Sequence, residues 1–294
     1  MKAATVRPRM VSADGVPMSA LVAEVPDPHA VVVALHGGGT TSIYFDCPGQ
    51  ATLSLLRTGA ALGYTVIALD RPGYGSSALY PEAMTEPEQR VRLAYLAVDR
   101  ILGDRARGAG LFVLGHSNGC ELAVRMAADD RGSELLGLEL AGTGLRYQDA
   151  ARAALGSAGP GQRPAGLREL LWEPAALYPE AVLRGITNAS PGSPYEADMV
   201  TSWPRRDFPS LAGRVRVPVR FTFAEHEKVW ESGPDAQREI RDIFTAADSF
   251  TSHQQPEAGH NLSLGFSAAE YHRSVLSFVD DCAAAVVARD SEVS

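Results

Sequence analysis

The sequence has few cysteines and no long hydrophobic run. Its three cysteines, Cys47, Cys120 and Cys282, are odd in number and far apart, which fits neither a disulfide framework nor a paired zinc site. No window approaches the roughly 20 apolar residues of a membrane span, and the N-terminal residues MKAATVRPRMVSADG lack the apolar stretch of a signal peptide. We therefore expect a soluble, cytoplasmic protein with reduced cysteines and no membrane partner.

Clusters of basic residues are also missing. The formal net charge is −8, and Lys2 and Lys228 are the only lysines. Binding to a nucleic-acid backbone depends on grouped Lys and Arg side chains that displace counterions. We therefore exclude nucleic acid as a partner. The remaining basic residues are arginines and alanine is abundant, which is typical of a GC-rich bacterial gene.

Short apolar segments predict a sheet. The stretch TVRPRMVSADGVPMSALVAEV contains two strand-like halves joined by Asp14-Gly15, a pair that favours a tight hairpin turn. The runs AVVVALHGGG (30–39), GYTVIALDRPGYG (63–75) and GLFVLGHSNG (110–119) are almost continuously apolar before they reach glycine. Strands of this kind are typical of a parallel sheet covered by helices on both faces.

Helical patterns alternate with these strands. Thr85 and Glu88 have the spacing of a capping box and predict the start of one helix, and Ser267 with Glu270 predicts the start of the last. Two more strands are predicted within 135–145 and 215–225. Residues 146–214 interrupt the alternation with prolines and aromatic residues, which indicates a helical cap inserted after the sixth strand. We predict a core domain of 1–145 and 215–294 and a cap of 146–214.

The pentapeptide GHSNG centres on Ser117 and lies between a predicted strand and a predicted helix. Glycines at this spacing allow a sharp turn that exposes the serine hydroxyl and frees the amide of the next residue. In this context the chain resembles the α/β-hydrolase superfamily over nearly its whole length. The resemblance implies an α/β-hydrolase fold, with a mostly parallel central sheet flanked by helices, and implies that Ser117 is the nucleophile. The stretch DRPGYGSS also occurs in that superfamily, and we interpret it as a structural turn.

The resemblance also implies a base and an acid for Ser117. His260 follows a predicted strand and precedes the last helix, where the superfamily places its base, so we prefer it to the other six histidines. The acid should follow the strand within VPVRFTFAEHEKVW. Glu227 replaces the usual aspartate there and is our choice, with Glu225 as the alternative. Both glutamates could instead be solvated loop residues.

The segment HGGGT resembles the superfamily's oxyanion loop. By this resemblance the amides of Gly38 and Asn118 are the two expected donors to the oxyanion. The amide of Gly39 is the alternative to that of Gly38. His36, at the start of the loop, is expected to brace it rather than to take part in chemistry. A plain glycine turn is the structural alternative.

These residues together imply a serine hydrolase that needs no metal or organic cofactor. Its expected partner is a small-molecule acyl substrate, free or bound to a carrier protein, joined by an ester, lactone or thioester bond. Candidate pocket residues are Gly39, Trp172, Tyr178, Trp203 and Trp230. The four aromatic side chains favour a hydrophobic substrate. The alternative is that these side chains only build the core of the cap. Two other functions stay open, an acyltransferase or cyclase with the same triad and a non-catalytic ligand-binding protein. The oligomeric state stays open as well.

Overall fold

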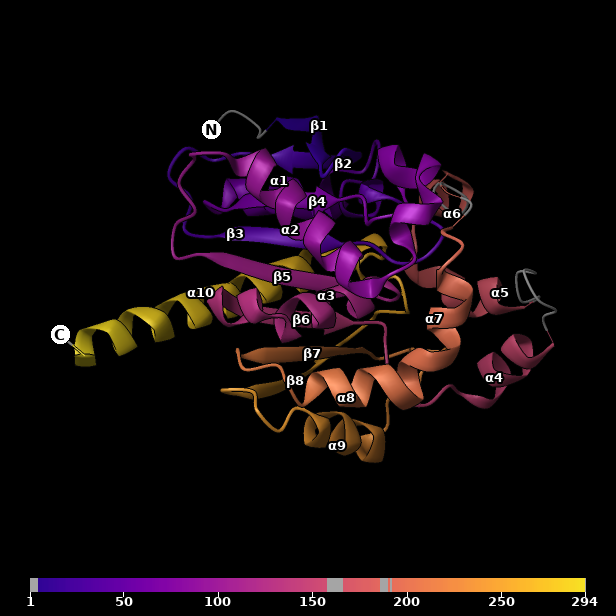
Figure 1. Ribbon diagram of the computed structural model, residues 1–294. Helices are drawn as coiled ribbons and strands as arrows, with labels where there is room; N and C mark the ends of the chain where they lie inside the picture. Colours follow the sequence, from indigo (N-terminus) through magenta and orange to yellow (C-terminus); the bar gives the residue numbers. More distant parts are fainter. Residues whose placement is uncertain (1–4, 158–165, 186–189, 191, 294) are drawn as a thin grey trace.

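One mixed sheet forms the centre of the residues that the structure, a computed structural model, describes: 5–157, 166–185, 190 and 192–293 (Figure 1). Over these residues the sheet has eight strands in the order β1-β2-β4-β3-β5-β6-β7-β8. Only the β1–β2 and β2–β4 pairs are antiparallel. The strands are β1 (Val6–Ala13), β2 (Val16–Ala23), β3 (Val31–Leu35), β4 (Thr65–Leu69), β5 (Leu111–His116), β6 (Leu135–Ala141), β7 (Val219–Ala224) and β8 (Phe250–Gln255). The expected mostly parallel sheet is confirmed.

The helices of the described residues fall into two groups. The α helices are α1 (Leu55–Ala61), α2 (Pro87–Leu102), α3 (Gly119–Ala128), α4 (Asp149–Gly156), α5 (Leu167–Leu171), α6 (Glu180–Gly185), α7 (Glu196–Ser202), α8 (Phe208–Ala212), α9 (Pro234–Ile243) and α10 (Ala268–Val293). The short helices are η1 (Ser42–Phe45), η2 (Ala51–Leu53), η3 (Gly75–Leu79), η4 (Pro81–Met84), η5 (Asp130–Glu134), η6 (Ala175–Leu177), η7 (Trp203–Asp207) and η8 (Leu262–Leu264). Within this part of the chain, none of the helices has the length and apolar character that crossing a membrane requires.

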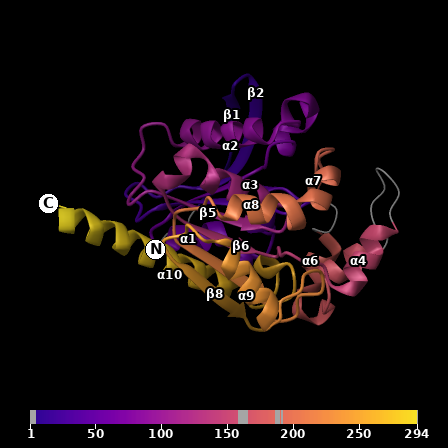
Figure 2. The same cartoon turned by 60° about the horizontal axis from the view of Figure 1, so that its bottom comes forward.

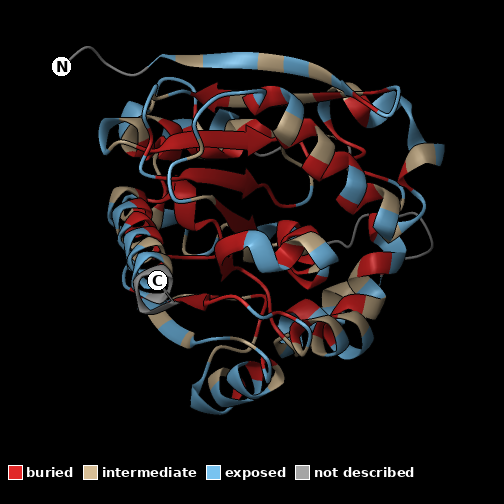
Figure 3. Cartoon of the chain, turned by 60° about the vertical axis from the view of Figure 1, so that its left-hand side comes forward, coloured by how far each residue is buried: buried red, intermediate tan, exposed pale blue. Residues whose placement is uncertain are grey.

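The first two strands form the hairpin that the sequence predicts. Asp14 and Gly15 both have positive φ, 49° and 81°, and connect Ala13 to its partner Val16. Positive φ at both turn residues matches the right-handed twist of the paired strands, which is why Asp-Gly is favoured there. The hairpin places β1 at an edge of the sheet, where several of its side chains are exposed (Figure 3).

The inner strands are buried on both faces. Every residue of β3 to β7 is buried, and successive side chains point to opposite faces. In β3, Val31, Val33 and Leu35 join one hydrophobic cluster with α2, α3, α8 and α9, whereas Val32 and Ala34 join a second cluster with α1 and α10. The sheet is therefore the middle layer of three (Figure 2).

The predicted N-cap of α2, Thr85, is wrong by one residue, because the observed N-cap is Glu86. The helix begins at Pro87, and no side chain caps it. The hydroxyl of Thr85 instead donates to the carbonyl of Glu82. Proline suits the first position of a helix because its missing N–H has no partner there, and its ring disfavours helical geometry in the residue before it. Pro87 therefore overrides the capping box expected from Thr85 and Glu88.

Helices α4 to α8 lie between β6 and β7 in the chain. Figure 1 shows α4, α5, α6 and α7 gathered at one end of the sheet, on the right. The helical insertion after the sixth strand is therefore present, and we refer to the described residues of 146–214 as the cap. Part of the predicted cap, residues 158–165, 186–189 and 191, lies outside the described residues.

Candidate active site

Ser117 occupies a strained turn between β5 and α3. Its φ is 52°, in the left-handed region that side chains other than glycine rarely adopt. The flanking glycines are required by close packing. A Cβ added to Gly115 would lie 2.9 Å from Cα of Cys120, and one added to Gly119 would lie 2.2 Å from the carbonyl oxygen of Leu35. The amide of Ser117 donates to the carbonyl of Ala141 at 2.8 Å, which ties the turn to the end of β6.

His260 lies between Ser117 and Glu227. Its Nε2 is 3.1 Å from Oγ of Ser117, and its Nδ1 is 3.1 and 3.0 Å from Oε1 and Oε2 of Glu227. The imidazole is buried, and it comes from the loop that joins β8 to α10. The structure thus brings the three predicted residues into one chain of hydrogen bonds from three separate loops.

Neighbouring side chains fix the backbone on both sides of His260. Nε2 of the His116 ring donates to the carbonyl of His260 at 2.9 Å, and the amide of Asn261 donates to the hydroxyl of Tyr178 at 3.1 Å. The Asn261 side chain donates to the carbonyl of Leu171 at 2.8 Å. Burial, followed by the nearby His260, lowers the pKa of His116 to about 3, so its ring stays neutral. The cap segment 171–178 therefore braces the loop that carries His260.

Glu227 is buried and held in its charged form. Burial favours the neutral carboxyl, but attraction to His260 and hydrogen bonds from His260 and the amides of Val229 and Trp230 lower its pKa below the usual value. The amide of Val229 donates to Oε1 at 2.8 Å. Nε2 of Gln148 donates to the backbone carbonyl of Glu227 at 2.7 Å. An ionised carboxylate thus faces Nδ1 of His260 and orients the ring.

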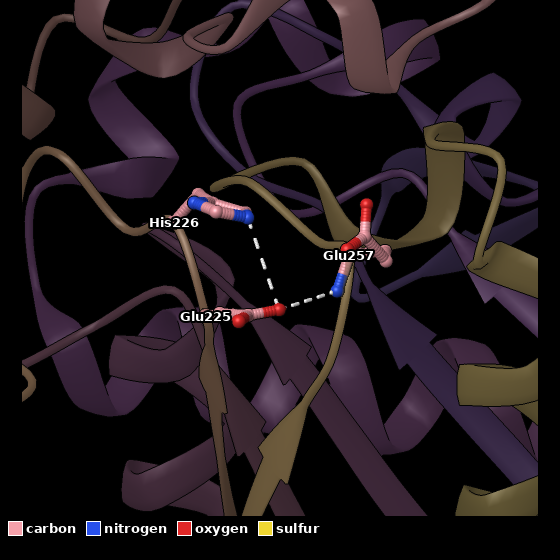
Figure 4. A group of neighbouring side chains, drawn as sticks. All are labelled: Glu225, His226 and Glu257. Carbon is pink, nitrogen blue, oxygen red and sulfur yellow. Dashed lines mark hydrogen bonds and ion pairs between the residues drawn. The ribbon is translucent and has the colours of Figure 1, made fainter.

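Glu225, the alternative acid, makes its contacts elsewhere. Its Oε2 accepts a hydrogen bond from the amide of Glu257 at 2.8 Å and lies 3.8 Å from Nε2 of His226 (Figure 4). The three side chains form a small surface group whose nearest nitrogen and oxygen atoms lie within 4.8 Å of one another. Glu227, and not Glu225, is therefore the glutamate that contacts His260.

The predicted oxyanion loop runs beside the Ser117 turn. A Cβ added to Gly38 would lie 2.7 Å from Nδ2 of Asn118, and one added to Gly37 would lie 3.0 Å from Cβ of Ser117. The amide of Gly39 donates to the hydroxyl of Tyr74 at 3.3 Å. Since its amide already has this partner, Gly39 is a weaker candidate donor for an oxyanion than Gly38.

His36 braces this loop, as expected. Its Nδ1 donates to the carbonyl of Gly37 at 2.8 Å, and its Nε2 accepts from the amide of Arg71 at 3.1 Å. Both ring nitrogens are therefore occupied. Burial, and then the charge of Arg71, lowers the pKa of His36 well below its usual value. A neutral ring with two backbone partners has a structural role.

The four aromatic pocket candidates make contacts within the protein. Trp203 is buried, stacks on Phe208 and donates Nε1 to Oγ1 of Thr143 at 2.9 Å. Trp230 is buried and stacks on Tyr147 with ring centroids 4.0 Å apart. Tyr178 is buried beside His260, and the half-buried Trp172 meets its ring edge-on. Contact with substrate stays a prediction for all four residues and for Gly39.

Three residues that support the site were missed by the sequence reasoning. Gln148 contacts the loop of Glu227, Asn261 ties the loop of His260 to Leu171, and Gly142 packs under two histidines. Asn261 follows His260 directly, which is the one clue that the sequence offered. The other two lie far along the chain from the residues they support.

Comparison with known proteins identifies the family of the chain. Residues 32–273 match the alpha/beta hydrolase family, and the chain belongs to that family. No curated protein sequence matched the chain.

Solved structures share the fold at low identity. An N-acyl homoserine lactonase, AidH, is 19% identical, with a TM-score of 0.66 over 95% of this chain and 98% of that one. A carboxyl esterase from Bacillus coagulans is 17% identical, with a TM-score of 0.62 over 95% and 99%. The thioesterase domain from the curacin biosynthetic pathway is 18% identical, with a TM-score of 0.60 over 94% and 99%. At this identity the likeness establishes the fold alone.

Proposed function

We propose that this chain is a serine hydrolase that cleaves a carboxylic ester, lactone or thioester of a mainly hydrophobic substrate through an acyl-enzyme on Ser117. The observation that carries the proposal is the hydrogen-bonded chain from Ser117 through His260 to Glu227. An esterase, a lactonase and a thioesterase share the fold, which supports the same range of bonds.

The proposed reaction has two halves, formation and hydrolysis of the acyl-enzyme, and His260 transfers one proton in each. Oγ of Ser117 attacks the substrate carbonyl while Nε2 of His260 takes the hydroxyl proton. The imidazolium then donates that proton to the departing alcohol or thiol, and the acyl group remains on Ser117. Water, deprotonated by Nε2 of His260, attacks the acyl-enzyme; the bond to Oγ then breaks, the acid leaves, and the imidazolium returns the proton to Oγ of Ser117. The charge of Glu227 stabilises the imidazolium, and the amides of Gly38 and Asn118 stabilise the oxyanion of each tetrahedral intermediate.

The burial of Glu227 favours catalysis over simple ligand binding. Removing a carboxylate from water costs free energy unless charged or hydrogen-bonding groups compensate. Glu227 is buried, and part of its compensation is a histidine that also contacts a serine hydroxyl. Ligand binding alone does not require that arrangement, whereas a nucleophilic serine requires a base and a group that orients the base.

The first test is covalent labelling. We expect intact-protein mass spectrometry to find one fluorophosphonate adduct on the wild type and none on Ser117→Ala. The circular dichroism spectra of the two proteins should match, because Ser117 is not part of the hydrophobic core. An adduct on both proteins would place the nucleophile elsewhere. No adduct on the wild type, even with a small unhindered probe, would favour the ligand-binding alternative.

Product analysis then separates hydrolysis from acyl transfer. Matched ester, lactone and thioester substrates with the same acyl chain are incubated with and without an alcohol or amine acceptor. We expect the free acid as the main product in every case. A new ester or amide formed in preference to the acid would identify an acyltransferase that uses the same triad.

A further inference from the structure

Glu196 of the cap helix α7 contacts two side chains that follow β4. Its Oε1 accepts a hydrogen bond from Nη2 of Arg71 at 2.6 Å, and its Oε2 accepts one from the hydroxyl of Tyr74 at 2.5 Å. Glu196, Arg71 and Tyr74 are all buried. One carboxylate of the cap therefore joins two residues of the core, 125 and 122 positions away in the chain.

The two partners of Glu196 hold the peptide groups on either side of Gly38. Nη2 of Arg71 also donates to the carbonyl of Gly37 at 2.9 Å. The hydroxyl of Tyr74 accepts from the amide of Gly39 at 3.3 Å. Gly38, whose amide is the proposed oxyanion donor, lies between these two anchored residues. Even the carboxylate itself is near, because a Cβ added to Gly38 would lie 3.5 Å from Oε2 of Glu196.

The direction of the Tyr74 hydrogen bonds depends on the carboxylate of Glu196. The Tyr74 hydroxyl has one proton. Since that proton is donated to the carboxylate, the oxygen's lone pairs stay free to accept from the amide of Gly39. Arg71 is fully buried, and a buried guanidinium requires a paired anion. Without the carboxylate, the hydrogen-bond partners left to Arg71 among the described residues are neutral, namely the carbonyl of Gly37 and the hydroxyl of Tyr195. The Tyr74 hydroxyl loses its acceptor as well.

A second cap ion pair offers a comparison. Asp207, in η7, accepts from Nη2 of Arg125 on α3 at 3.3 Å and from the hydroxyl of Ser202 at 3.0 Å. This pair also joins the cap to the core, but the partners of Asp207 among the described residues do not include the loop of Gly37 to Gly39. It separates the general effect of fastening the cap from a specific effect on the oxyanion site.

We propose that Glu196 is a positioning residue that sets the oxyanion site through Arg71 and Tyr74, so that docking of α7 on the core is required for full activity. This inference rests on the proposed function. It makes the cap part of the catalytic apparatus. The triad of Ser117, His260 and Glu227 is complete without Glu196, but the oxyanion loop is not.

The test compares Glu196→Gln with Asp207→Asn. For a p-nitrophenyl ester we expect kcat of Glu196→Gln to fall by about 10- to 100-fold, since removing one oxyanion donor outright costs about 10²- to 10³-fold. KM should change by less than about threefold, because ground-state binding does not use the donor. Asp207→Asn should keep both constants within about threefold of the wild type. The melting temperatures of both variants are measured alongside.

Binding of a transition-state analogue distinguishes a positioning role of Glu196 from a merely structural one, because a merely structural role would not weaken that binding selectively. A trifluoromethyl ketone adds the Ser117 hydroxyl to its carbonyl and forms a hemiketal oxyanion, with the serine proton held by His260. We expect its inhibition constant to rise in Glu196→Gln by the same factor as kcat/KM falls. The matching trifluoromethyl alcohol, which cannot add the serine, should bind both proteins equally. Equal weakening of ketone and alcohol, or equal losses in Glu196→Gln and Asp207→Asn, would overturn the proposal.

Tyr74→Phe serves if Glu196→Gln does not fold. It keeps the Arg71–Glu196 pair and removes only the hydroxyl that contacts Gly39. We expect a smaller loss in kcat, again matched by weaker binding of the ketone, and an unchanged rate would overturn the proposal. The wild type separates the two levels of inference. If fluorophosphonate labels the wild type, and the wild type and the variants are equally active, only the role of Glu196 is overturned. If the wild type is neither labelled nor active, the proposed function itself is overturned.

Discussion

Oε2 of Glu227 lies 3.0 Å from Nδ1 of His260, although the two residues follow different strands and are 33 positions apart. Two residues before Glu227, the carboxylate of Glu225 contacts Glu257 and His226 instead. The chain therefore offers two nearby glutamates of the same chemistry, of which one contacts the histidine. This pair makes a matched test of the acid.

Glu227→Gln should lower kcat/KM by about 10²- to 10⁴-fold, because a neutral amide neither stabilises the imidazolium nor fixes its tautomer. Glu225→Gln removes the same charge from the protein surface and should stay within about twofold of the wild type. Ester hydrolysis and the rate of fluorophosphonate labelling measure both variants. The reverse ranking would show that Glu225 reaches His260 in solution.

Gly142→Ala should reduce activity more than its effect on stability explains. Gly142 has a φ of 69°, and an added Cβ would lie 3.1 Å from Nε2 of His116 and 3.1 Å from Cε1 of His260. Positive φ costs alanine about 1–2 kcal/mol of stability. Displacement of the His260 ring should lower kcat by about tenfold or more.

Gly15→Ala is the control for backbone strain. Gly15 has a φ of 81° but no atom within 4 Å of the added Cβ, and it lies in the hairpin turn between β1 and β2. It should lose a similar amount of stability and keep its kcat. Urea unfolding and ester hydrolysis distinguish the two effects. Equal kcat in both variants would mean that the His260 ring tolerates the added methyl group.

His272 should make the protein sensitive to acid. It is fully buried in α10, and neither ring nitrogen has a hydrogen-bond partner among the described residues. Burial, and then the charge of Arg273, lowers its pKa from 6.5 to about 3. Below pH 6.5 the unfolded chain therefore binds a proton that the folded chain does not. The free energy of unfolding should fall by about 1–2 kcal/mol from this group between pH 7.5 and 5.

His272→Phe isolates that contribution. Other groups also titrate in this range. Burial raises the pKa of Glu139 to about 7 against the opposing charge of Arg220, so Glu139 contributes stability that is lost as the pH rises from about 4.5 to 7. The free energy of unfolding in urea is measured for wild type and variant at pH 7.5 and 5. Subtracting the change in the variant from the change in the wild type cancels the contributions that both proteins share. We expect the variant to lose about 1–2 kcal/mol less than the wild type, and an equal loss in both would contradict the assignment to His272.

Local sequence features predicted much of the fold. The Asp14-Gly15 turn, the buried strands and the glycine-flanked Ser117 each depend on preferences of residues close together in the chain. The same reasoning failed for α2, where two local signals competed. Thr85 and Glu88 had the spacing of a capping box, but the ring of Pro87 determines where the helix begins.

The candidate site was predictable only in part. Resemblance to a family reduced the candidates for the acid of the triad to Glu225 and Glu227, because both follow the same strand. Only the tertiary structure shows which carboxylate faces His260. The aromatic residues of the cap show the same limit, since composition indicated large apolar side chains without showing that Trp203 and Trp230 stack on neighbours.

The sequence by itself determined the order of strands and helices and the strained turn at Ser117, since steric preferences act between neighbouring residues. The tertiary structure alone decided that His260, 143 positions after Ser117, reaches its hydroxyl, and that Glu196 of the cap reaches Arg71 beside the predicted oxyanion loop. Contacts over such distances arise when parallel strands end at the same edge of a sheet and an insertion folds back over that edge. No local pattern records that alignment, because the packing of the whole chain produces it.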